Sequence, residues 1–105
     1  MIDLHTHTFL SDGALIPSEL VRRARVKGYR AIAITDHVDA SNVEVLVPQL
    51  AQVCQRLNDL GPLLVVPGVE ITHVPPEDLA AVVASARAAG AQLIVVHGET
   101  TVEPV

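Results

Sequence analysis

Two histidines near the start of the chain have the spacing of a shared cation site. They lie in the segment Asp3-Leu-His5-Thr-His7. Side chains two residues apart on a β-strand point to the same face, so both imidazoles would reach one place. Zinc, iron and manganese accept mixed shells of imidazole and carboxylate. The spacing therefore predicts a metal site at the end of an N-terminal strand.

Further nitrogen and oxygen donors follow three later apolar runs. They are Asp36-His37, Glu70 and His97. The carboxyl ends of consecutive parallel strands meet at one edge, where α/β folds place their sites. Each signal alone is weak, but gathering so many titratable groups without a partner would be costly. We therefore expect one metal centre, in which Glu70 is the best candidate for bridging two ions.

The predicted chemistry is hydrolysis, above all of a phosphate ester. Two divalent ions about 3.5–4 Å apart can bind the oxygens of a phosphate, supply a hydroxide nucleophile and stabilise the leaving oxygen. A bound ion lowers the pKa of water from about 15.7 to about 7, so that hydroxide is present at neutral pH.

Strands and helices alternate in the sequence that must position these donors. Strands are expected at 1–8, 30–35, 63–71 with an interruption at Pro67-Gly68, and 92–98, before a loop at 99–105. Helices are expected from Pro17 to Gly28, from a Ser41–Glu44 capping box to about Asp59, and from Pro75 to Gly90. Pro48 predicts either a kink or a restart of the second helix. The βαβαβαβ order predicts a parallel sheet.

Composition limits the class of protein. The chain has 105 residues, enough for one modest domain, and a net charge of −5, which argues against direct nucleic-acid binding through phosphate contacts. Cys54 is the single cysteine, so no internal disulfide forms and a cytoplasmic location is expected. We expect this thiol to be buried and unreactive. The N-terminus lacks signal-peptide features, and no apolar run approaches the roughly 18 residues of a membrane span.

Five ordered segments resemble the motifs of the polymerase and histidinol phosphatase (PHP) family. They are His5-Thr-His7, Ser11-Asp12-Gly13, Thr35-Asp36-His37, Gly68-Val-Glu70 and Val96-His97-Gly98. The resemblance covers essentially the whole chain. It implies a distorted TIM-like barrel of seven parallel strands. It also implies a cofactor of two or three zinc, manganese or iron ions, and metal-dependent phosphoesterase activity.

The resemblance assigns roles to individual residues. His5, His7 and Glu70 would bind the first metal, and Glu70 would bridge to a second metal that His97 also binds. These four residues form the expected catalytic centre.

Three aspartates and one histidine surround that centre. Asp12 and His37 would belong to a third, outer metal, and Asp36 would orient a ligand from behind it. Asp3 has two equally weighted interpretations. It either orients an imidazole from the strand face that it would share with His5 and His7, or it is a charge at a strand edge.

The chain is shorter than a complete barrel. A (β/α)₈ barrel typically needs about 250 residues, and four strands are expected here. The family's later ligands, a His or Cys and an Asp-x-His motif, have no counterpart after His97. Residues 1–105 are therefore interpreted as a single truncated domain, the N-terminal half of a PHP barrel. Its open edges and apolar face would need a missing C-terminal half or a second copy of the chain.

Two functions remain open from the sequence. The chain is either the metal-binding half of a phosphoesterase or a non-catalytic metal-binding or assembly module. The phosphoesterase would act on a small phosphorylated substrate such as histidinol phosphate or a nucleotide, once completed. The missing ligands favour the module for the isolated chain, whereas the intact motifs favour the phosphoesterase for a parent protein.

Overall fold

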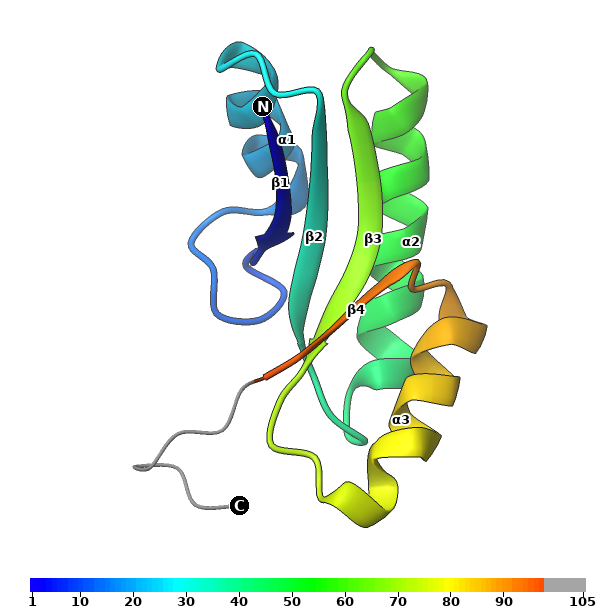
Figure 1. Cartoon of the computed structure of the whole chain (residues 1–105). Coiled ribbons are helices and arrows are strands. Elements are labelled where there is room, and N and C mark those ends of the chain that lie inside the picture. Colours follow the sequence, from blue (N-terminus) through cyan, green and yellow to red (C-terminus); the bar gives the residue numbers. More distant parts are fainter. Residues whose placement is uncertain (98–105) are drawn as a thin grey trace.

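The computed structural model describes residues 1–97; Gly98 and the expected loop at 99–105 lie outside the described residues. Four strands and three helices alternate in order (Figure 1): β1 (Ile2–Thr6), α1 (Pro17–Val26), β2 (Ala31–Val38), α2 (Val43–Asp59), β3 (Leu64–Ile71), α3 (Pro76–Ala89) and β4 (Leu93–Val96). All strand pairs are parallel, and the sheet order is β1-β2-β3-β4. The predicted βαβαβαβ arrangement is confirmed.

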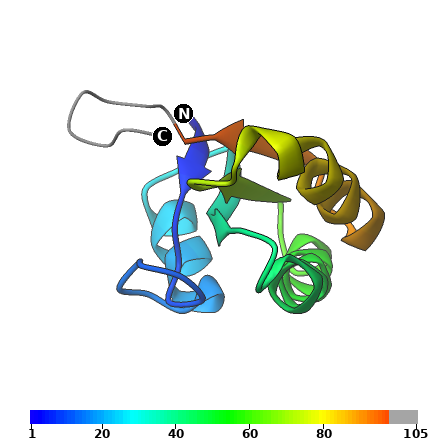
Figure 2. The same ribbon diagram turned by 90° about the horizontal axis from the view of Figure 1, so that it is seen from below.

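The sheet is curled, and the helices lie along its outer side (Figure 2). Right-handed crossovers between consecutive parallel strands place every helix on the same side of the sheet. The helix α2 fills the centre of the core because its apolar residues recur at helical spacing. Its buried residues are Val43, Leu46, Val47, Leu50, Cys54 and Leu57. The result is a curled half-barrel of the TIM-like type.

The structure decides two local predictions for α2. The helix is continuous through Pro48, which excludes a restart. The capping box at Ser41–Glu44 is wrong, because Asn42 precedes the helix and no side chain caps it. The Ser41 hydroxyl instead donates to the carboxylate of Asp39.

The interruption predicted in β3 at Pro67-Gly68 is also wrong. The ladder to β2 is unbroken from Leu64 to Ile71. The Pro67 carbonyl accepts from Gln92, so its missing N–H would also face the β4 side, at the point where β4 pairing begins. Gly68 then allows close approach, since an added Cβ would lie 2.7 Å from the carbonyl oxygen of Leu93.

An irregularity in β1 changes which side chains face inward. Asp3 pairs with Ile32 and Thr6 pairs with Ile34, so β1 contains one extra residue between these two pairs. Such a bulge re-aims the side chains that follow it. The side chain of Asp3 therefore lies on the helix side with Ile32, while His5 lies on the inner side of the curl.

The inner side also carries exposed apolar residues. Ile2 and Leu64 are level with each other across Ala31 of β2, and they are 61% and 54% exposed. The next residues along β2 and β3, Ile32 and Val65, point to the helices and are buried. In residues 1–97, no helix has the length and hydrophobicity that crossing a lipid bilayer requires.

The Cys54 thiol provides a test of the packing around α2. Burial, together with the nearby carboxylate of Asp36, raises its pKa from 9.0 to about 12. Because only the thiolate reacts, alkylation in mildly alkaline buffer should be roughly a thousandfold slower in the native chain than in urea. Labelling with iodoacetamide followed by mass spectrometry measures this ratio. Equal rates in buffer and urea would contradict the burial.

Candidate metal centre

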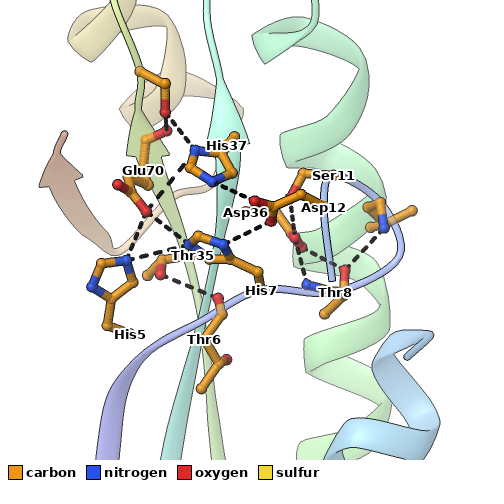
Figure 3. Close-up of polar contacts among 12 residues, drawn as sticks. His5, Thr6, His7, Thr8, Ser11, Asp12, Thr35, Asp36, His37 and Glu70 are labelled. Carbon is orange, nitrogen blue, oxygen red and sulfur yellow. Dashed lines mark hydrogen bonds and ion pairs between the residues drawn. The ribbon is translucent and has the colours of Figure 1, made fainter. Parts of the chain in front are cut away.

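Glu70, near the end of β3, is the meeting point of three imidazoles. Its Oε1 lies 2.7 Å from Nε2 of His5 and 2.7 Å from Nε2 of His7 (Figure 3). Its Oε2 lies 3.0 Å from Nδ1 of His97, which directly follows β4. Glu70 is 5% exposed. The carboxylate therefore joins the ends of β1, β3 and β4.

A second donor group shares His7 with the first. His7 Nδ1 lies 2.8 Å from one oxygen of Asp12, and His37 Nε2 lies 3.0 Å from the other (Figure 3). The rings of His7 and His37 meet edge to face, with centroids 4.3 Å apart. Two sets of three ligand atoms thus lie close enough to hold an ion. They are His5, His7 and Glu70, and His7, Asp12 and His37.

The hydrogen-bonding capacity of His7 calls for a cation in this cluster. Both of its ring nitrogens face carboxylate oxygens, but a neutral imidazole has only one N–H to donate. A second proton or a metal ion would balance these contacts. Two nitrogens bound at about 2.05 Å to a tetrahedral zinc lie about 3.3 Å apart. The Nε2 atoms of His5 and His7 are already 3.3 Å apart, whereas their 2.7 Å contacts with Glu70 Oε1 are direct hydrogen-bond distances that would lengthen around an ion. The types of donor in the set are those that a divalent ion accepts.

The two carboxylates of the cluster are ionised at neutral pH. Burial would raise the pKa of Glu70, but hydrogen bonds from His5, His97 and His7, together with the charge of His37, lower it to about 2. For Asp12, slight burial raises the pKa, but hydrogen bonds and charge interactions with His7 and His37 outweigh this effect. The pKa of Asp12 is therefore also lowered. Ionised carboxylates are the form that binds metals.

Asp36 holds the loop that carries Asp12. Its buried carboxylate accepts hydrogen bonds from the Thr8 amide at 2.6 Å and from the hydroxyls of Thr8 and Ser11 (Figure 3). Within this loop, Gly13 passes so close to the backbone of His7 that a Cβ would lie 2.5 Å from the His7 carbonyl oxygen. Asp36 therefore fixes the loop that carries Asp12, and the described hydrogen bonds of its carboxylate go to this loop rather than to its neighbour His37.

Asp3, which was expected on the face of His5 and His7, lies elsewhere. It lines a cavity of about 240 Å³ on the α1 side, together with Leu20 and Tyr29. Its carboxylate accepts from the backbone amide of His5 at 3.1 Å. The bulge in β1 is the physical reason for this separation, since the extra residue breaks the two-residue alternation.

Sequence reasoning assigned no individual role to three hydroxyl residues of the site. Thr8 and Ser11 bind Asp36, and Thr72 contacts the ring of His37. The signal available for the first two was their place in the loop directly after the histidine pair. His73 lies on the same rim with a φ of 54°, and its ring centroid is 4.9 Å from that of His97.

The fold and the rim together define a TIM-like α/β half-barrel with a candidate metal centre at the carboxyl ends of its strands. The chain belongs to the PHP domain family, because the model of that family matches residues 3–99.

Relatives with curated names support this assignment. The chain is 51% identical over 104 residues to uncharacterized protein MJ1295 of Methanocaldococcus jannaschii. This match covers 98% of the chain and 48% of that protein. It is 38% identical over 72 residues to the 5'-3' exoribonuclease Rnm of Escherichia coli, covering 69% of the chain and 22% of the relative. A 36-residue match, 50% identical, covers 34% of the chain and 13% of a 3',5'-nucleoside bisphosphate phosphatase of Chromobacterium violaceum.

The chain thus spans about half the length of MJ1295 and smaller shares of the other two relatives. No solved structure matches the chain.

Proposed function

We propose that the chain supplies the metal-binding part of a phosphoesterase active site that holds two or three zinc, manganese or iron ions. The observation that carries the proposal is the contact of one carboxylate, Glu70, with three imidazoles from two other strand ends. His5 and His7 would bind one ion with Glu70, and His97 would share Glu70 around a second. A third would lie at the group that Asp12 and His37 form with His7.

The chain's own residues would prepare this site for phosphate-ester hydrolysis. Divalent ions supply charge for the phosphoryl oxygens and make a water acidic enough to attack at neutral pH. Glu70 presents its two oxygens to different imidazoles, which suits it to bridging. Asp36 fixes the loop with Asp12 and limits reorganisation during the reaction. The hydroxide formed from this water would bond to phosphorus, the ester P–O bond would break, and the leaving alkoxide would take up the proton that the water lost.

The active form would need a partner over the inner side of the sheet. Ile2 and Leu64 are exposed there, and apolar faces of parallel sheets are normally covered. Because the chain matches 48% of MJ1295, we propose that a complementary half-barrel is the partner. A second copy of the chain is the alternative, which size-exclusion chromatography with light scattering would reveal as a stable dimer.

The proposed substrate is a small phosphorylated molecule in the cytoplasm. The relatives named as a nucleoside bisphosphate phosphatase and as exoribonucleases make nucleotides the first class to test. Histidinol phosphate is the second class. The net charge of −5 disfavours a long nucleic-acid surface on this chain, so short oligoribonucleotides belong in the panel as a separate arm.

Metal content and turnover together test the proposal. The full chain is measured alone and co-expressed with the part of MJ1295 that the chain does not match. The substrates are p-nitrophenyl phosphate and a nucleoside 3',5'-bisphosphate. We expect bound metal in both states and turnover after co-expression. Stoichiometric metal without turnover in either state would favour a non-catalytic metal-binding or assembly module, and absence of bound metal would overturn the proposal.

A further inference from the structure

Thr72 lies between the two donor groups of the metal centre. It directly follows β3, and its amide donates to the carbonyl of Val38 at 3.1 Å, which holds it beside the end of β2. Its hydroxyl oxygen lies 2.6 Å from Nδ1 of His37 and 3.1 Å from the backbone carbonyl oxygen of Glu70. The residue is half-buried. The Thr72 hydroxyl thus contacts His37, which belongs to the second donor group, and the backbone of Glu70, which belongs to the first.

These two contacts fix the direction of each hydrogen bond. A hydroxyl has a single proton to donate, and a backbone carbonyl can only accept. The Thr72 proton therefore goes to Glu70, and the hydroxyl oxygen offers a lone pair to His37. The ring must then carry its proton on Nδ1. If Thr72 instead donated its proton to His37, its oxygen would face the backbone carbonyl oxygen of Glu70 with no proton between them.

In the neutral ring, a proton on Nδ1 leaves the Nε2 lone pair of His37 directed toward Asp12, 3.0 Å away. Two acceptors at this distance repel unless a cation joins them, either a second proton on Nε2, which gives the charged ring, or a metal ion. Without the Thr72 hydroxyl, a neutral ring could instead carry its proton on Nε2 and donate it to Asp12, because Glu70 Oε1 lies 4.0 Å from Nδ1, too far for a hydrogen bond. A proton on Nε2 would occupy the lone pair that a metal ion needs.

We propose that Thr72 is a positioning residue that fixes the tautomer of His37 and thereby makes its Nε2 a ligand in the group with His7 and Asp12. Hydrogen bonds behind a ligating imidazole set its tautomer and orientation in metal sites. The effect on metal binding rests on the proposed function, whereas the tautomer itself does not.

Two substitutions at one position test this inference in the full chain. Thr72→Val removes the hydroxyl and keeps the shape, and Thr72→Ser restores the hydroxyl. Histidine labelled with ¹⁵N reports the tautomer in the metal-free chain, and a His37→Gln variant identifies the signals of that ring. We expect a proton on Nδ1 of His37 in the wild type and in Thr72→Ser, and a mixture of tautomers in Thr72→Val.

Zinc titration of the same samples measures the consequence. Thr72→Val should weaken binding followed at His37 by about 10–100-fold, while binding followed at His5 and binding in Thr72→Ser change by less than about threefold. A wild-type ring with its proton on Nε2 and none on Nδ1, unchanged affinity at His37, or equal losses at both histidines would overturn the inference. If the wild type binds no zinc, the proposed function fails, and the tautomer comparison still decides the role of Thr72.

Discussion

Glu70→Gln should abolish metal binding at the first donor group and with it any hydrolytic activity. The substitution keeps the size of the side chain but removes the charge that three imidazoles share. Partners behind a metal ligand are worth about 10–100-fold in affinity, so the loss of a directly bound carboxylate should exceed 100-fold. Equilibrium dialysis with zinc or manganese, followed by elemental analysis, gives the affinity.

Glu77→Gln is the matched control, because Glu77 is an exposed acid in the first turn of α3. It should bind metal as the wild type does. The pKa of Glu70, about 2, adds a second expectation. The folded state lowers this pKa, so its contribution to stability is present above the ordinary value near 4.5 and declines only as the pH falls from there toward 2. If Glu70→Gln bound metal as tightly as the wild type, Glu70 would not be a ligand of the metal centre.

Asp36→Asn should cause a larger loss of folding stability than either Glu70→Gln or Thr72→Val. The carboxylate is fully buried and accepts three hydrogen bonds from Thr8 and Ser11. An amide keeps one acceptor oxygen and places an NH₂ group against the remaining donors. A buried donor left without a partner costs about 1–3 kcal/mol, and we expect a loss of about 2–3 kcal/mol. For a chain of this size, the loss corresponds to a decrease in Tm of about 10–20 °C.

The same substitution should also release the loop that carries Asp12, and so weaken the second donor group about 10–100-fold. Thermal unfolding and zinc titration separate the two effects. Asp59→Asn, at the exposed end of α2, is the control and should change stability by less than about 0.5 kcal/mol. A Tm for Asp36→Asn within about 2 °C of the wild type would show that the hydrogen bonds between Asp36 and the loop are dispensable for stability.

The sequence predicted the rim of the sheet but not its local geometry. Apolar runs that alternate with helical segments fix a parallel order, and the donors that follow the runs then gather at one edge. This reasoning placed His7, His37 and Glu70 correctly at strand ends. The bulge in β1 escaped it, because an extra residue is defined only by the pairing with β2.

The other differences have the same origin in tertiary contacts. Pro67 is tolerated because of where β4 begins, which the local sequence does not encode. Ser41 forms no capping box because Asp39 competes for its hydroxyl. The roles of Thr8, Ser11 and Thr72 depend on contacts with residues more than twenty positions away in the chain.

The position of β1 has a consequence for how the chain would respond to a chelator. Within residues 1–97, β1 pairs only with β2, yet His5 and His7 reach past that strand to Glu70 on β3. An ion bound by these residues would link β1 directly to β3. Its removal should let the N-terminal strand fray first, so faster amide exchange at Leu4 and Thr6 would precede any loss of helix.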